Sequence, residues 1–119
     1  MECVGGGMSI KTATADSYFS KFIIARDRVC QKCGTKENLT CSHYFRRGHS
    51  STRFDPKNCI ALCVKCHSLW ENTKNYDYKT FMVKLLGKDG YDALDSKSRC
   101  FMKRRDAVIE FMGWYRANN

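Results

Sequence analysis

Long hydrophobic runs are missing from this sequence. No stretch within the 119 residues approaches the roughly 20 apolar residues that a helix needs to cross a bilayer. The N-terminus also lacks a basic segment followed by an apolar run, which is the pattern of a secretory signal. There is no internal repeat, no low-complexity tract and no linker between domains. We therefore expect one domain of common size, located in the cytoplasm and without a membrane partner.

Acidic residues are few relative to basic ones. The chain has 12 Asp and Glu residues against 21 Lys and Arg residues, which gives a formal net charge of +9 and a pI near 9.3. Such an excess favours polyanionic partners, and nucleic acid is the first candidate. An anionic membrane surface is the rival candidate, but the lack of a run of roughly 20 apolar residues counts against it.

Eight cysteines are present, and they have two alternative uses. In a secreted protein an even number indicates a disulfide framework. Here four of them form two C-x-x-C pairs: Cys30 and Cys33, Cys63 and Cys66. Two such pairs complete a tetrahedral zinc site with no open position, so we predict a structural Zn²⁺ ion that contributes folding free energy. We expect the other four to be reduced, small apolar side chains: Cys3, Cys41, Cys59 and Cys100.

The region around the two cysteine pairs predicts short elements. A helix over 17–28, capped by Asp16 or Ser17, leads into the first pair. Two short strands and a basic loop between them are expected between the pairs: residues 39–45, 58–62 and 46–57. A short helix begins at His67, after the second pair. The expected fold class is a small, zinc-stabilised α+β domain with a ββα core flanked by helices.

Beyond the second pair the pattern is helical. Apolar residues from Tyr78 to Leu86 recur at i, i+3, i+4, i+7 and i+8, and Gly87 is a natural stop. A turn or short helix over 89–94 and a longer helix from Ser96 follow. The single domain thus has three expected parts: a flexible lead-in over 1–15, a zinc-bound core over 28–72 and a helical part over 76–119.

Residues between the cysteine pairs, and the histidine directly after them, suit phosphodiester chemistry. His43 ends the first strand, and a neutral imidazole with an unperturbed pKa near 6.5 can take a proton from water. His67 directly follows a zinc ligand, and an imidazole there can hold a divalent ion at the scissile phosphate. The Asn58 amide can tie the loop to the backbone near His43 and so position that ring. Phosphodiester hydrolysis needs a base, a metal ion and positive charge beside the phosphate oxygens.

Two groups of basic residues are candidates for nucleic-acid binding. Arg46, Arg47 and Arg53 lie in the loop between the strands, where phosphate contact is favoured over a role as solvated charges. A second run is predicted on the last helix: Lys97, Arg99, Lys103, Arg104 and Arg105. Such a run is usually a solvated helix face. As a hypothesis, Lys103, Arg104 and Arg105 extend the DNA track away from the scissile bond.

The combination of motifs resembles a known family. C-x-x-C, Ser42-His43-Tyr44, Asn58 and C-x-x-C-His67 together resemble the HNH, or ββα-metal (His-Me finger), nucleases. The stretch from Cys41 to Asn58 is similar to phage-encoded HNH proteins of the NinG/Rap recombination-nuclease type. The resemblance covers about residues 28–72. It implies a DNA endonuclease in which His43 is the general base, Asn58 supports the catalytic loop and His67 holds a single Mg²⁺ or Mn²⁺ ion.

Ser42 departs from the family pattern. Many HNH proteins have an aspartate at this position as a second ligand of the catalytic metal, and a serine hydroxyl is a poorer ligand. Either the ion depends on substrate phosphate, with Ser42 as a weak ligand, or His49, which also fits the NinG-like pattern, completes the catalytic site. The resemblance further implies branched recombination DNA as a substrate, and symmetric resolution of a junction would require a homodimer.

Two alternatives belong to other functional classes. A non-catalytic, zinc-stapled module that binds DNA or RNA has the same charge and the same zinc site, but it does not need His43 or Asn58. A disulfide-exchange protein would use C-x-x-C for redox chemistry. Two paired motifs in a small basic chain favour zinc over exchange, and a content of one zinc per chain would exclude exchange.

Overall fold

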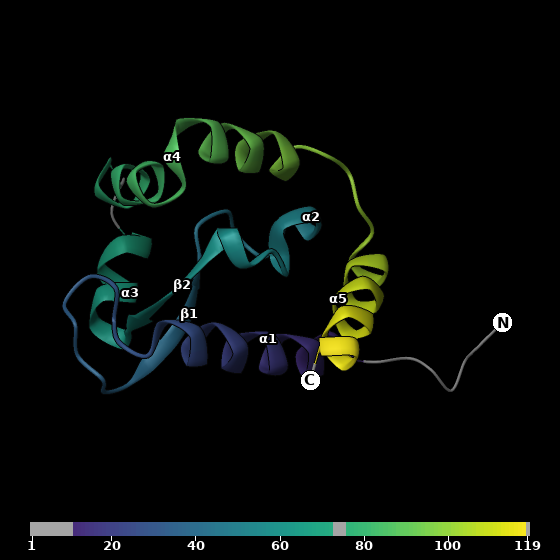
Figure 1. Cartoon of the computed structure of the whole chain (residues 1–119), viewed down its shortest axis with the longest axis horizontal. Helices are drawn as coiled ribbons and strands as arrows, with labels where there is room; N and C mark the ends of the chain where they lie inside the picture. The colour runs from purple at the N-terminus through teal and green to yellow at the C-terminus, as the bar shows by residue number, and fades with distance from the viewer. Residues whose placement is uncertain (1–10, 73–75, 119) are drawn as a thin grey trace, which may run out of the picture.

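The computed structural model describes residues 11–72 and 76–118 of the chain. The elements, in chain order, are α1 (Thr12–Asp27), β1 (Leu39–His43), α2 (Ser50–Arg53), the 3-10 turn η2 (Pro56–Asn58), β2 (Cys59–Cys63), α3 (Val64–Asn72), α4 (Tyr76–Ser98) and α5 (Arg104–Asn118). They form a small α+β structure, as the sequence predicts, with α1, α3 and α4 arranged around a two-stranded sheet (Figure 1). None of the helices in the described ranges is long and apolar enough to cross a membrane.

The sheet is a short antiparallel hairpin between the two cysteine pairs. Leu39 pairs with Cys63 at one end and His43 with Cys59 at the other. All five residues of β2 are buried, because helices cover both faces of this strand. Side chains alternate between the faces of a strand, so β2 separates two apolar clusters. One cluster contains Ile60, Leu62, Trp70, Tyr78 and Met82. The other contains Cys59, Phe19, Ile23, Val108 and Phe111.

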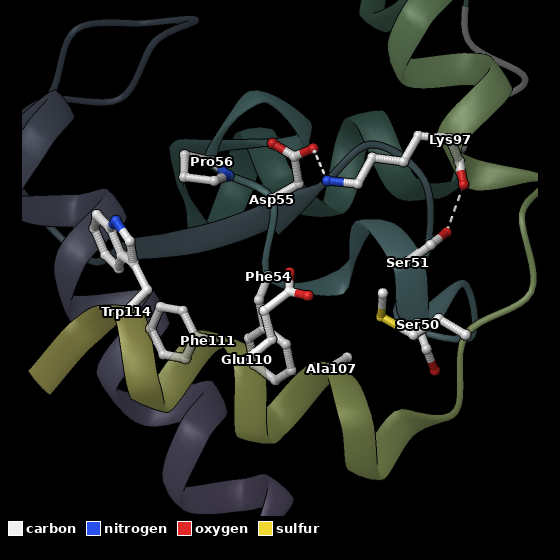
Figure 2. Close-up of a pocket in the computed structure, with 11 residues that line it drawn as sticks. Ser50, Ser51, Phe54, Asp55, Pro56, Lys97, Ala107, Glu110, Phe111 and Trp114 are labelled. Atoms are coloured by element: carbon white, nitrogen blue, oxygen red, sulfur yellow. Dashed lines mark hydrogen bonds and ion pairs between the residues drawn. The ribbon is translucent and has the colours of Figure 1, made fainter. Parts of the chain in front are cut away.

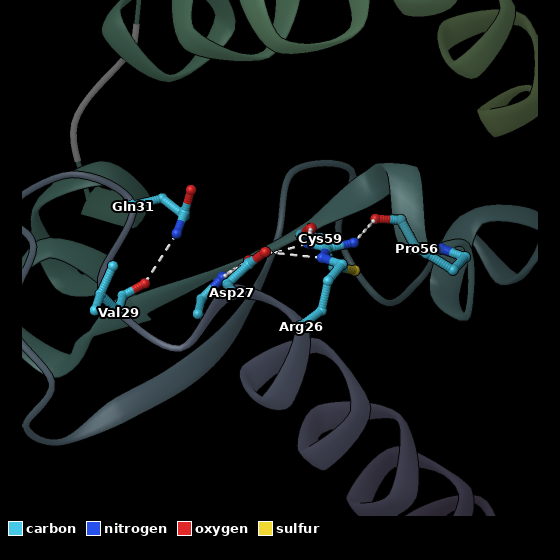
Figure 3. Close-up of polar contacts among 7 residues, drawn as sticks. Arg26, Asp27, Val29, Gln31, Pro56 and Cys59 are labelled. Atoms are coloured by element: carbon cyan, nitrogen blue, oxygen red, sulfur yellow. Dashed lines mark hydrogen bonds and ion pairs between the residues drawn. The ribbon is translucent and has the colours of Figure 1, made fainter. Parts of the chain in front are cut away.

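The C-terminal end of α1 covers the free edge of β2 (Figure 3). The Asp27 carboxylate accepts the backbone N–H of Ala61 at 2.8 Å. The Arg26 guanidinium donates to the carbonyl oxygens of Cys59 at 2.7 Å and Pro56 at 2.8 Å. These bonds satisfy backbone groups that an exposed strand edge would leave unpaired. They also fix the end of α1, and with it the first cysteine pair, against β2.

Helix α1 begins earlier than the sequence predicts. The helix was expected over 17–28 and a flexible lead-in over 1–15, but residues from Thr12 onward are helical. Residues 1–10 lie outside the described ranges. Asp16 is therefore inside the helix and not its cap. Ala15 is fully buried in the cluster that includes Val108 of α5, and such tertiary packing stabilises a helix beyond its local start signals.

The predicted basic loop over 46–57 contains two short helical turns, α2 and η2. The Asp55 side chain accepts the backbone N–H of Lys57 at 2.9 Å, and Pro56 occupies the first position of η2. Proline suits this position because its missing N–H would have no partner within the helix. The segment is thus an ordered support for the end of β1.

The boundaries of the C-terminal helices differ from the predicted boundaries. α4 continues past Gly87, but the helical backbone breaks there, because Gly87 has φ 77° and ψ 162°. Glycine adopts this conformation without a Cβ clash, so the predicted stop appears as a kink. The predicted element over 89–94 is the second half of α4, and the last helix begins at Arg104 rather than Ser96.

Candidate functional site

Four cysteine sulfurs converge where the first C-x-x-C turn meets the end of β2 and the start of α3. The sulfur atoms of Cys30, Cys33, Cys63 and Cys66 all lie within 4.8 Å of one another. Cys33 Sγ and Cys63 Sγ are 3.8 Å apart, which matches the edge of about 3.8 Å in a tetrahedron with Zn–S bonds near 2.3 Å. The backbone N–H groups of Cys33 and Cys66 donate to Cys30 Sγ and Cys63 Sγ, each at 3.4 Å. The cluster therefore fits a metal ion such as zinc.

The ionisation of these thiols favours a bound cation. Burial acts to raise the pKa of Cys30, but backbone N–H donors, including that of Cys33, outweigh it and lower this pKa to about 6. Burial and hydrogen bonds to the neighbouring cysteines raise the pKa of Cys66 to about 12. One thiolate forms readily, whereas further negative charge is costly unless a cation compensates it.

His43 lies at the end of β1 with its ring held in one orientation. Its Nε2 is 2.8 Å from the carbonyl oxygen of Arg53. A carbonyl only accepts hydrogen bonds, so Nε2 carries the proton and Nδ1 has the free lone pair. The ring packs beside Phe19, with ring centroids 5.9 Å apart. Burial is the main cause that lowers the pKa of His43 to about 4, and the positive charge of Arg47 adds to it.

We expect the His43 ring to be neutral at pH 6, with its proton on Nε2. A pKa of about 4 leaves about 1% of the rings charged, whereas an ordinary imidazole with a pKa near 6.5 is about three-quarters charged at that pH. Long-range proton–nitrogen correlation spectra of the zinc-loaded protein distinguish the two ring nitrogens. A ring protonated on both nitrogens at pH 6 would contradict this orientation.

Asn58 is buried at the end of η2, and both its amide oxygen and its amide nitrogen make hydrogen bonds. Its Oδ1 accepts the backbone N–H of Phe45 at 2.8 Å. Its Nδ2 donates to the carbonyl oxygens of Phe45 at 2.9 Å and Thr52 at 3.1 Å. Thr52 precedes Arg53, whose carbonyl oxygen orients the His43 ring. Asn58 therefore ties together the two segments that flank His43.

His67 lies in α3, in the turn after the second cysteine pair, with both ring nitrogens near oxygen atoms. The Thr40 hydroxyl donates to the Leu62 carbonyl at 2.7 Å, so it accepts from His67 Nδ1, which is 2.8 Å away. His67 Nε2 faces a carboxylate oxygen of Glu71 at 3.1 Å. A lone pair and a carboxylate repel each other unless a proton or a metal ion lies between them. Sequence analysis missed Glu71, although its i+4 spacing from His67 was an available signal.

The two histidines share one hollow of about 470 Å³ in the protein surface. Its polar lining comes from β1, the following loop and α3: Ser42, His43, Arg46, Arg47, His67 and Glu71. Its aromatic walls include Tyr44, Trp70 and Tyr78. The hollow thus joins a neutral imidazole, a histidine–glutamate pair and two arginines.

The predicted alternatives for a further metal ligand, Ser42 and His49, both make other contacts, and only Ser42 lines the hollow. Ser42 is only 1% exposed, and its Oγ lies 2.9 Å from the Tyr78 hydroxyl. His49 is absent from the described lining of the hollow. Its Nδ1 donates to the Ser98 carbonyl at the end of α4, at 3.2 Å. The structure therefore places Glu71 beside His67 Nε2, and it gives no support to His49 as a catalytic residue.

Arg53 has a different role from the phosphate contact that the sequence predicts. Its guanidinium donates to the two carboxylate oxygens of Asp16 at 3.0 and 2.6 Å, and its side chain is only 12% exposed. This pair fastens α2 to α1. The Arg47 side chain is 60% exposed, with a nitrogen 3.7 Å from the same carboxylate, and Arg46 is also exposed. For these two exposed arginines, phosphate contact stays a prediction.

The second basic run is not confined to the last helix. Lys97 lies in α4 and pairs with Asp55 at 2.8 Å, and Arg99 pairs with Asp95 at 2.8 Å. The three residues predicted to contact DNA are exposed at the start of α5: Lys103, Arg104 and Arg105. α5 lies at the opposite end of the molecule from α3 (Figure 1), and the contact of these three residues with DNA stays a prediction.

Another hollow of about 340 Å³ lies between the α2–η2 segment and α5 (Figure 2). Its floor includes Phe54 and Phe111, which stack with ring centroids 5.0 Å apart. Its charged rim includes the ion pair between Asp55 and Lys97. Neither of the two histidines nor the two arginines of the first hollow lines it, so we assign the candidate chemistry to the first hollow.

Comparison of the chain with protein-family models, with curated proteins and with solved structures finds no match. The functional argument therefore rests on the geometry of the hollow and on the motifs of the sequence.

Proposed function

We propose that this chain is a metal-dependent DNA endonuclease of the HNH type, with a structural Zn²⁺ ion at its four-cysteine cluster. The observation that carries the proposal is the shared hollow, which His43, His67 and Glu71 all line. The cysteine cluster lies at the junction of β2 and α3, so a bound zinc ion would hold α3, and hence His67, against the hairpin that carries His43. A nucleic-acid-binding module needs no such arrangement of imidazoles.

His43 is the proposed general base. Its Nδ1 is free to take a proton from water, because Nε2–H is donated to the Arg53 carbonyl. The lowered pKa keeps the ring in its neutral form at physiological pH. As the ring gains positive charge, the Arg53 carbonyl dipole stabilises it. The activated water then attacks the phosphorus, and the sugar oxygen on the opposite side leaves.

His67 and Glu71 are the proposed protein ligands of the catalytic Mg²⁺ or Mn²⁺ ion. Imidazole nitrogen suits Mn²⁺ better than Mg²⁺, whereas the carboxylate suits both. When bound, such an ion stabilises negative charge on the phosphate and on the leaving oxygen. With two protein ligands, the remaining positions would be filled by water and substrate phosphate. Arg46 and Arg47 at the rim would bind the flanking phosphates.

The Glu71→Gln variant tests this ligand pair. We expect the Mn²⁺ concentration that gives half-maximal cleavage to rise by about 10-fold to 100-fold, because an amide oxygen lacks the carboxylate charge. The measurement is the initial rate of plasmid cleavage over a Mn²⁺ titration. Glu110→Gln, an exposed site on α5, is the matched control and should leave the titration unchanged. Identical Mn²⁺ dependence in both variants would contradict the assignment of Glu71.

Two finer features of the proposal rest on the sequence resemblance alone. One is a preference for branched recombination DNA, and the other is a homodimer that could cut both strands of a junction. Cleavage of linear duplex and four-way-junction DNA, compared at equal concentrations, would separate the general activity from this preference.

A further inference from the structure

Three ligand-type side chains outside the four-cysteine cluster converge on one face of the hairpin. The strand register places His43 directly opposite Cys59, and Cys41 precedes His43 by two residues on the same strand. Residues two apart on a strand share a face, and residues opposite each other in a pair are close neighbours. One ligand atom from each of the three lies within 4.8 Å of the other two. The group thus offers two sulfurs and one imidazole.

The surroundings of this group suit a soft metal ion. Cys59 is buried, Cys41 is partly buried, and both pack in the apolar cluster between α1 and α5. Two thiolates neutralise a divalent cation, so the bound set would carry no net charge into this apolar region. A separation of 4.8 Å at most requires the ligands to approach by about 1 Å to reach the tetrahedral edge near 3.8 Å.

We propose that Cys41, His43 and Cys59 form a second metal site, which takes a thiophilic divalent cation such as Zn²⁺ and thereby inhibits cleavage. Binding forms two metal–sulfur bonds and one metal–nitrogen bond and releases two thiol protons. Because His43 donates Nε2–H to Arg53, Nδ1 is the nitrogen with a lone pair for the ion. The same lone pair cannot also accept a proton from water. Mg²⁺ prefers oxygen ligands and would not compete for the sulfurs.

The binding part of this proposal is independent of nuclease activity, whereas the inhibition rests on the proposed function. Binding is measured by equilibrium dialysis of the full chain against Zn²⁺, with a phosphine reductant that keeps the thiols reduced. We expect wild type to bind a second equivalent more weakly than the first. Cys41→Ala should lose the second equivalent and keep the first. Cys100→Ala, at an exposed cysteine in the segment between α4 and α5, should keep both.

Retention of the first zinc equivalent and an unchanged circular dichroism spectrum would show that the Cys41→Ala variant is folded. If this variant does not fold, the Cys41→Ser variant is used in its place. A wild type that binds a single equivalent, or a variant that retains the second, would overturn the site. In cleavage assays with Mn²⁺, we expect Cys41→Ala to need at least about tenfold more Zn²⁺ than wild type for half-inhibition. Equal inhibition of both would overturn the inhibitory role of this site. A protein that never cuts DNA would refute the nuclease while the dialysis still decides the metal site.

Discussion

Removal of the metal from the four-cysteine cluster, or the Cys66→Ser substitution, is expected to unfold the domain. Cys30, Cys63 and Cys66 are buried members of the cluster that packs α3 and α4 against β2. Zinc binding to such a site contributes about 10–16 kcal/mol to folding, which is comparable to the total stability of about 5–15 kcal/mol of a typical domain. Circular dichroism and thermal melting, before and after treatment with a strong chelator, measure the effect.

Cys100→Ser is the control for this substitution, because Cys100 is exposed and outside the cluster. It should melt as the wild type does and contain the same amount of zinc. A chain that is shown to be metal-free and still melts cooperatively at the wild-type temperature would refute the structural role of the metal.

Replacement of His43 by alanine is expected to reduce the rate of DNA cleavage by about 100-fold to 10,000-fold, the usual contribution of a general base. DNA affinity should change little, because the proposed phosphate contacts belong to Arg46 and Arg47 at the rim of the hollow. Single-turnover cleavage and fluorescence anisotropy measure the two quantities separately.

His49→Ala is the matched control, since its ring is exposed and bound to the end of α4. It should cleave at a rate close to that of wild type. The partly buried His43 ring also contributes packing, so His43→Gln, which retains most of the volume, should be equally inactive while melting near the wild-type temperature. Cleavage by His43→Ala at the wild-type rate would exclude His43 as the base.

Local signals in the sequence predicted the hairpin and its cysteine cluster. The C-x-x-C spacing fixes two ligands within one turn, and the two strands between the pairs are short enough to have a single antiparallel pairing. The i+4 relation of Glu71 to His67 was also readable from the sequence, because a helix was expected there, whereas the serine at position 42 favoured His49 as the further ligand. The Ser42 hydroxyl instead pairs with Tyr78 of α4, a contact between residues 36 positions apart in the chain.

The features that the sequence did not predict depend on contacts between distant segments. Arg53 binds Asp16 across 37 positions, which turns an apparent phosphate ligand into a link between helices. α1 starts at Thr12 because Ala15 packs in the cluster with α5, a contact that no local cap signal contains. The strand register brings Cys59 close to Cys41 and His43. Because local sequence signals do not contain this contact, both cysteines were predicted to be ordinary apolar side chains.

The most direct test of the account is the incubation of wild-type protein, loaded with one equivalent of zinc, with supercoiled plasmid. One reaction contains Mn²⁺, and the other contains excess chelator for a time too short to extract the structural zinc. The account predicts conversion of the plasmid to nicked or linear DNA in Mn²⁺ and none in chelator. Protein that binds the plasmid, shifts it in a gel and leaves it uncut with every divalent metal would contradict the account and favour a non-catalytic binding module.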